Sequence, residues 1–480
     1  MCIRDRRFYR AAWFGVFQNV LVIAWVMRAM AKIIMVVMGW EEGASVMGID
    51  AGVFTVLVLF VIAVAYTALS GLWGVVITDV LQFVLAMGGS IYLAAAVWSR
   101  LGGLDGILSR LPGQGFDAAE MLRMLPAPDR LLAANPFTEF LLLILVVWWS
   151  SYQVDGGGYI SQRLFAAKDD RNAVLAYLWF VVAHICMRPW PWIIVGLGGM
   201  AIFGRVGDPE TYYPMVMKEI LPPGIFGLII ASFFAAFMST IDTQLNWGSS
   251  LVVNDIFRRY LWKGRSDRSY MAVARLSVLA LAVLGAIASF AVRDISLAWK
   301  LIISVTAGIG SVYIARWYWW RVNAWSEISA MVTAGLCTLV FAILASTERF
   351  AGSPFTRFPY STVITFFIVV PSWLTVTMLT PPVGEERLVD FYRRVRPGGR
   401  GWDRIRRKAG VESGPGTAMR TAAKIISGNI LVMASLIGTG SLILGAPGRG
   451  ILLLALAAAS GGTLILLLIG DVKPSGGKRV

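Results

Sequence analysis

The chain has 480 residues, of which 57% are hydrophobic and 15% charged, and its mean hydropathy is +0.70. This composition is too apolar for an ordinary soluble domain and indicates an integral membrane protein. The single histidine excludes a paired-histidine metal site, and the sequence contains no Gly-rich phosphate loop of the kind an ATP-driven pump uses. Three scattered cysteines predict neither a disulfide framework nor a metal centre.

Apolar runs long enough to cross a hydrocarbon core of about 30 Å recur along the whole chain. Because the runs are long and do not alternate, they predict one all-α polytopic domain covering residues 1–480 rather than a barrel. The twelve runs lie near residues 11–39, 52–69, 74–98, 137–162, 173–203, 224–251, 270–292, 296–319, 325–345, 359–380, 424–446 and 450–470.

The net charge of +15 follows the membrane topology. With the N-terminus inside, alternate loops on that side, together with the run ends that adjoin them, hold 28 of the 43 Lys and Arg, the other side holds ten, and five lie deeper within runs. This positive-inside pattern predicts that both ends of the chain are cytoplasmic and gives no sign of nucleic-acid binding. Residues 381–423 are expected to form a basic cytoplasmic linker, and residues 1–10 a cytoplasmic start that need not be native.

Two of the runs carry polar residues in the first third of the chain. In GLWGVVITDVLQF, Asp79 lies toward the cytoplasmic mouth of its run, where it could line an ion path or serve as a snorkelling or capping group. In SSYQVDGGGYISQR, three glycines follow Gln153 and Asp155. Such glycines predict either an unwound helix that exposes backbone groups or a close helix crossing.

A third run, MSTIDTQLNWGSS, is unusually rich in side-chain oxygens. At about 100° per residue its hydroxyl and amide groups fall on one helix face. Oxygens of this kind suit a hard cation such as sodium. Close packing, with hydroxyls bonding across an interface or to the i−4 carbonyl, explains the stripe equally well. The stripe comprises Ser239, Thr240, Thr243, Asn246 and Ser250, with Asp242 at its edge.

Together these segments resemble the sodium:solute symporter family, whose members carry solutes such as proline, galactose, sialic acid and pantothenate. GLWGVVITDVLQF is similar to the fifth core helix of the family, GGGYISQRLFAAKDDRNA to the sixth and AAFMSTIDTQLNWGSSLVVNDIF to the eighth. RWYWWRVNAWSEISAM adds a later matching segment. The resemblance implies a leucine-transporter-like fold of two inverted repeats, with solute and sodium near the membrane midplane.

Site residues follow from this resemblance by position. The sodium ligands implied are the Ala236 carbonyl, Ser239 and Thr240, with further ligands at Asp242 and Thr243. Asp79 corresponds to an aspartate on the sodium release path.

The substrate side resembles the family less closely. Ser150 and Gln153 replace residues of the galactose carriers and His184 replaces a lysine, so a sugar carrier of that subtype is not expected. With Asp155, these residues suggest a polar solute, cationic or zwitterionic.

The beginning of the chain departs from the family pattern. GVFQNVLVIAWVMRAMAKII resembles the third core helix, so a leading helix and core helices one and two are expected to be missing. The cytoplasmic position predicted for the N-terminus agrees with the loss of three spans, because the N-terminus of family members lies outside the cell.

The prediction is therefore a sodium-coupled symporter of the cell membrane that imports a small polar solute by alternating access. It is not expected to be an enzyme or to hold a cofactor other than the coupling ion. Two alternatives are proton coupling through Asp242 and a non-transporting sensor on the same fold. An enzyme around His184 and Asp155 would need a nucleophile or metal that the chain does not supply.

Overall fold

A computed structural model describes the protein over most of its length. The described residues are 8–41, 43–69, 72–130, 134–151, 154, 157–292, 294–411 and 418–470. Within these ranges the chain is mostly helical, and the one sheet found is a short antiparallel hairpin of β1 (Ser45–Val46) and β2 (Ile49–Asp50). The expectation of an all-α protein is confirmed.

Each of the twelve apolar runs coincides with helix. Over the described ranges, nine helices are long and apolar enough to cross a membrane. Two further runs correspond to shorter apolar helices, Ala51–Ala65 and Pro136–Ser150, and one is divided into α15 (Ile295–Val305) and α16 (Ile309–Tyr318). The division falls at Gly308, whose φ of 83° is a left-handed conformation that glycine adopts without strain.

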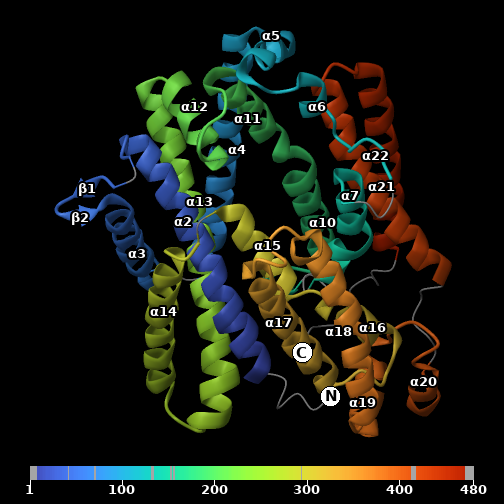
Figure 1. Ribbon diagram of the computed structural model, residues 1–480. Helices are drawn as coiled ribbons and strands as arrows, with labels where there is room; N and C mark the ends of the chain where they lie inside the picture. The colour runs from blue at the N-terminus through green and yellow to red at the C-terminus, as the bar shows by residue number, and fades with distance from the viewer. Residues whose placement is uncertain are drawn as a thin grey trace. The chain divides into compact units, whose positions relative to one another are not determined.

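Two compact units make up the chain. The first, here called the α2–α13 unit, combines Cys2–Ala118 with Pro191–Val305. Its elements, several of which are labelled in Figure 1, are η1 (Ala11–Gln18), α2 (Asn19–Met38), β1, β2, α3 (Ala51–Leu69), α4 (Leu72–Leu101), α5 (Gly103–Arg110), η2 (Pro112–Gln114), most of α11 (Pro189–Phe203), η6 (Pro209–Thr211), α12 (Tyr212–Ile220), α13 (Pro223–Leu251), η7 (Val252–Leu261), α14 (Asp267–Ser289) and α15.

The core of the α2–α13 unit lies where α2, α3, α13 and α14 pack together (Figure 1). Ile23, Leu59 and Ile241 are fully buried there and come from three different helices. The approach of α14 to α2 is very close, because a Cβ added to Gly285 would lie 2.2 Å from Ile23 Cγ2. Small residues at such crossings let helix backbones approach closely inside a membrane.

The second unit, here called the α16–α22 unit, combines Ala119–Trp190 with Thr306–Val480. Its elements are most of α6 (Ala118–Met121), α7 (Pro136–Leu142), η3 (Leu143–Val147), α8 (Trp148–Ser150), α9 (Gly157–Phe165), α10 (Asp170–Val181), η5 (Val182–Met187), α16, α17 (Ala324–Ser346), η8 (Pro354–Thr356), α18 (Tyr360–Leu379), α19 (Glu385–Val395), α20 (Asp403–Ala409), α21 (Ala418–Ile443) and α22 (Pro447–Ile469).

The glycine-marked run is interrupted, as one of the two predicted alternatives required. Helix α8 ends at Ser150, the next residue is extended, and α9 begins at Gly157. A close crossing occurs beside the same break, since a Cβ on Gly310 of α16 would lie 2.4 Å from the Ser151 carbonyl oxygen. The interruption is therefore found, whereas a close crossing at the three glycines themselves stays a prediction.

The basic stretch 381–423 has more structure than the linker that was expected. It contains the two short helices α19 and α20, whose facing sides form a small core. Its buried members are Val383, Leu388, Tyr392, Trp402, Ile405 and Ala409. Periodic apolar positions between the arginines supply this core, and the abundance of charge obscures them in the sequence.

Candidate ion and substrate sites

The oxygen-rich stripe lies in the second half of α13. Pro223 at the first helical position favours the start of this helix, because its missing N–H would have had no partner there. Further along, Ile241 and Leu245 anchor one face in the core of the α2–α13 unit. That anchoring fixes the rotation of α13 and therefore the direction of the polar residues between these two positions.

Exposure varies along the stripe, which is accessible at both ends and buried at Thr243 in the middle. Ala236 is exposed and Ser239 and Thr240 are half-buried, whereas Asp242 and Thr243 are 1% and 7% exposed. The three positions carried over as the principal sodium ligands thus lie at the accessible N-terminal end of the stripe. The two positions carried over as further ligands lie deeper.

Hydrogen bonds within α13 involve several of these oxygens. The Thr240 hydroxyl donates to the Ala236 carbonyl at 3.1 Å, and the Asn246 amide donates to Asp242 Oδ1 at 2.9 Å. The first bond is the i−4 back-bond that the packing alternative predicts. The Ala236 carbonyl also lies within the helical ladder of α13, where it accepts the Thr240 N–H, so both of its lone pairs are engaged, whereas the Thr240 oxygen can still accept. The group therefore fits packing as it stands, and it fits an oxygen-ligated cation once the Thr240 hydroxyl turns away from this carbonyl.

A helix crossing holds the backbone of α13 beside the stripe. The Asn19 amide, 1% exposed at the start of α2, donates to the Gln244 carbonyl at 2.7 Å and to the Gly15 carbonyl at 3.3 Å. Gly248 makes room for it, since a Cβ there would lie 2.1 Å from Asn19 Nδ2. A side-chain amide inside an apolar run was the signal for this contact, and the sequence analysis did not use it.

A charged cluster joins three other parts of the α2–α13 unit. The Lys32 ammonium, 11% exposed on α2, forms ion pairs with Asp208 at 2.8 Å and with Glu210. Glu210 Oε1 also accepts from the backbone N–H groups of Ile295 and Ser296, at 2.8 and 3.2 Å. The carboxylate thus caps α15, the first half of the divided run, where the helix dipole favours negative charge. This cluster was not predicted from the sequence.

The remaining sodium candidate is Asp79. It lies on α4, but its side chain falls outside the described residues.

The substrate candidates belong to the α16–α22 unit. Ser150 is fully buried at the end of α8, and its hydroxyl donates to the Val147 carbonyl at 3.2 Å. His184 is exposed on η5, stacks on Phe180 with 5.0 Å between ring centroids, and has Nδ1 2.9 Å from an Arg188 nitrogen. Arg188 is a cationic neighbour that the sequence analysis did not consider. Gln153 and Asp155 lie outside the described residues.

Interrupted spans and polar side chains within them define a multi-pass helical membrane protein built in the manner of secondary transporters. A solved Na⁺-coupled sialic acid symporter, in a substrate-bound outward-open state, matches with a TM-score of 0.57 at 20% identity. The match covers 78% of this chain and 75% of that one, and it confirms the leucine-transporter-like fold. The family model of the sodium:solute symporter family matches residues 16–334, and the chain belongs to this family.

Curated relatives match about two thirds of the chain. The osmoregulated proline transporter OpuE of Bacillus subtilis is 24% identical over 337 residues, which cover 66% of this chain and 62% of that protein. The high-affinity proline transporter PutP of the same organism is also 24% identical, over 68% of this chain and 67% of that protein. For OpuE, the matched segment is thus less than two thirds of the relative.

Proposed function

We propose that the protein is a sodium-coupled symporter that imports a small polar solute across the cell membrane. Family membership and the oxygen-rich stripe on α13 support this proposal. Inward movement of sodium is favoured by about 2.3 kcal/mol per charge for each 100 mV of membrane potential, which can drive solute uphill. Reciprocal coupling requires that sodium raise solute affinity and that solute raise sodium affinity by the same factor.

The sodium site in this proposal lies at the N-terminal end of the stripe. The Ala236 carbonyl and the Ser239 and Thr240 hydroxyls ligate the ion, with Asp242 and Thr243 behind them. The observation that carries the assignment is that Ala236 is exposed and Ser239 and Thr240 are half-buried, so an ion can reach these hard oxygen ligands from outside the core. Asp79 lies on the release path, and both ends of the chain face the cytoplasm, as the distribution of Lys and Arg favours.

The solute is polar, and Ser150, Gln153, Asp155 and His184 contribute to its recognition in this proposal. Arg188 beside His184 adds a cation, which favours a solute that carries a carboxylate. Proline and sialic acid, which the relatives are named for, both carry one and are suitable first probes.

Uptake of labelled proline and sialic acid into proteoliposomes tests the proposal. The full-length protein is used, including any coding sequence that upstream DNA adds to this chain. Uptake should require a sodium gradient and stop when choline replaces sodium at fixed pH. Uptake that persists in choline and follows a proton gradient would instead establish proton coupling, for which the buried Asp242 is the carrier. Sodium binding without transport of any solute tested would favour a sensor.

A further inference from the structure

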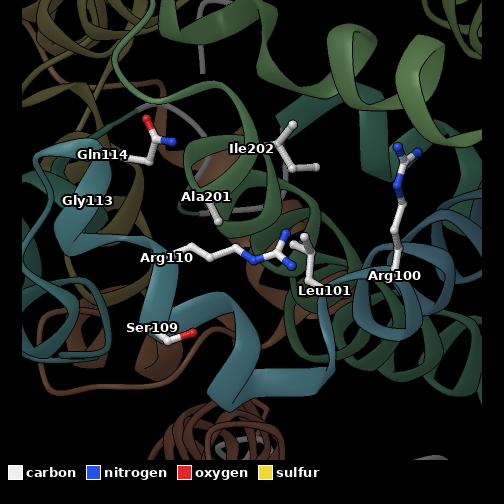
Figure 2. A pocket seen from close by; sticks show the side chains of 8 residues that line it. All are labelled: Arg100, Leu101, Ser109, Arg110, Gly113, Gln114, Ala201 and Ile202. Atoms are coloured by element: carbon white, nitrogen blue, oxygen red, sulfur yellow. The ribbon is translucent and has the colours of Figure 1, made fainter.

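A pocket in the α2–α13 unit lies away from the proposed sodium stripe. Its volume is about 470 Å³, and it forms where the ends of α4, α5 and α11 meet η2. Figure 2 shows the side chains around it, with the Arg110 guanidinium extending across the hollow toward Leu101. The lining residues are Arg100, Leu101, Ser109, Arg110, Gly113, Gln114, Ala201 and Ile202.

The depth of this pocket is fixed by the spans that line it. The apolar spans Val80–Leu101 and Asp170–Phe203 both end beside it. Its lining therefore changes from apolar, at Leu101, Ala201 and Ile202, to polar, at Ser109 and Gln114, over a short distance. Such a change marks the level at which hydrocarbon gives way to lipid headgroups and water.

The electrostatics of the pocket favour an anion. Arg100 is already neutralised, because it donates to the Glu219 carbonyl and to Glu219 Oε1, both at 2.8 Å. Within the part of the chain that the structure describes, no carboxylate lines the pocket and Arg110 has no ion-pair partner. One uncompensated guanidinium therefore faces the hollow, accompanied by the Gln114 amide and by the Ser109 hydroxyl, which donates to the Gly106 carbonyl at 3.2 Å.

The scarcity of basic residues on this side of the membrane makes their convergence significant. The charge distribution assigns this side to the exterior, and only ten Lys and Arg of 43 lie there. Two of those ten line one pocket at headgroup depth. These two arginines do not help to orient the chain in the membrane, because the excess of Lys and Arg on the cytoplasmic side would be larger without them.

We propose that the pocket formed by α4, α5, η2 and α11 binds an oxyanion, through the planar fork of Arg110 with Ser109 and Gln114 beside it. A guanidinium binds phosphate or carboxylate oxygens bidentately. Its single positive charge balances the negative charge of a phosphodiester in a membrane lipid or of a small free oxyanion. Recognition of lipid headgroups by basic pockets between membrane helices has the same physical basis. This site is independent of the proposed sodium coupling.

Lipid retention and phosphate binding distinguish the two sources of the anion. The full chain is purified into nanodiscs of mixed phosphatidylglycerol and phosphatidylcholine, and bound phosphatidylglycerol is measured by native mass spectrometry. In a parallel arm, inorganic phosphate is titrated against the protein in neutral detergent and the thermal midpoint is followed. The variants are Arg110→Gln, Arg110→Lys and, as a matched control, Arg123→Gln, an exposed arginine of the same loop region that does not line the pocket.

Arg110→Gln should lower phosphatidylglycerol retention about tenfold, the effect of one charge-assisted contact. Arg110→Lys should restore part of it, since it keeps the charge without the fork, and Arg123→Gln should match the wild type. A phosphate-induced shift that Arg110→Gln removes would assign the site to a free oxyanion, and lipid retention without such a shift would assign it to the lipid. Equal behaviour of Arg110→Gln and the wild type in both arms would overturn the proposal.

Discussion

Gly248→Ala probes the crossing that holds the polar half of α13 in place. The new Cβ would lie 2.1 Å from Asn19 Nδ2, 2.7 Å from Leu281 Cδ1 and 2.8 Å from the Gly15 carbonyl oxygen. A side chain can rotate away, but the Gly15 oxygen belongs to a neighbouring backbone and can move only with its helix. The substitution must therefore separate the two helices or break the bond from Asn19 to the Gln244 carbonyl.

The size of the effect follows from three contributions. Overpacking costs about 1–3 kcal/mol. Loss of an interhelical hydrogen bond inside the membrane costs about 1 kcal/mol. Replacing glycine by alanine within a helix stabilises the folded state by about 1 kcal/mol. The net loss should be about 1–3 kcal/mol.

Thermal unfolding of the purified protein in detergent measures this loss. Gly227→Ala is the matched control, because it lies on the same helix and an added Cβ there meets nothing within 4 Å. The control should be as stable as the wild type or slightly more stable, whereas Gly248→Ala should unfold at a lower temperature. Equal midpoints for the two variants would refute the close crossing.

Three further predictions concern contacts elsewhere in the two units. Lys32→Met removes the cation that Glu210 shares with the start of α15, so hydrogen exchange in Ile295–Val305 should accelerate; unchanged exchange would contradict the cap. Gly310→Ala should lower the unfolding temperature, because its Cβ would meet the Ser151 carbonyl, whereas exposed Gly352→Ala should not. The hydrogen bond from Lys408 holds the pKa of the Glu385 carboxyl below its ordinary value. The pair therefore stabilises α19 and α20 fully at pH values above that ordinary pKa. Protection of these helices from proteolysis should fall as pH falls through the lowered pKa, and Glu385→Gln should remove this dependence.

The sequence predicted the helical runs well because their physical signal is local. Any segment of about 20 apolar residues satisfies its own backbone only as a helix in lipid, wherever the rest of the chain lies. A break in this run was also predicted from its three adjacent glycines, although two of them lie within α9 and the extended residue, Ser151, precedes them. The stripe on α13 followed from helical periodicity alone.

The contacts that were missed depend on which helices become neighbours. Asn19 stands more than 200 positions before Gln244, and nothing local to either residue indicates that the amide of one meets the carbonyl of the other. Lys32 was recognised only as a charge within a run, because its partners Asp208 and Glu210 lie in a distant loop. Pairings of this kind are set by the tertiary fold, which single-chain patterns do not encode.

Equilibrium binding of radioactive sodium tests the central claim most directly. The full-length protein is compared with the double variant Ser239→Ala, Thr240→Ala and with Ser250→Ala, which alters an exposed stripe residue that is not a proposed ligand. Wild type and Ser250→Ala should bind sodium saturably in a choline background, and the double variant should bind it at least about tenfold more weakly, the loss of charge-assisted contacts to two ligands. Undiminished sodium binding by the double variant would contradict the account.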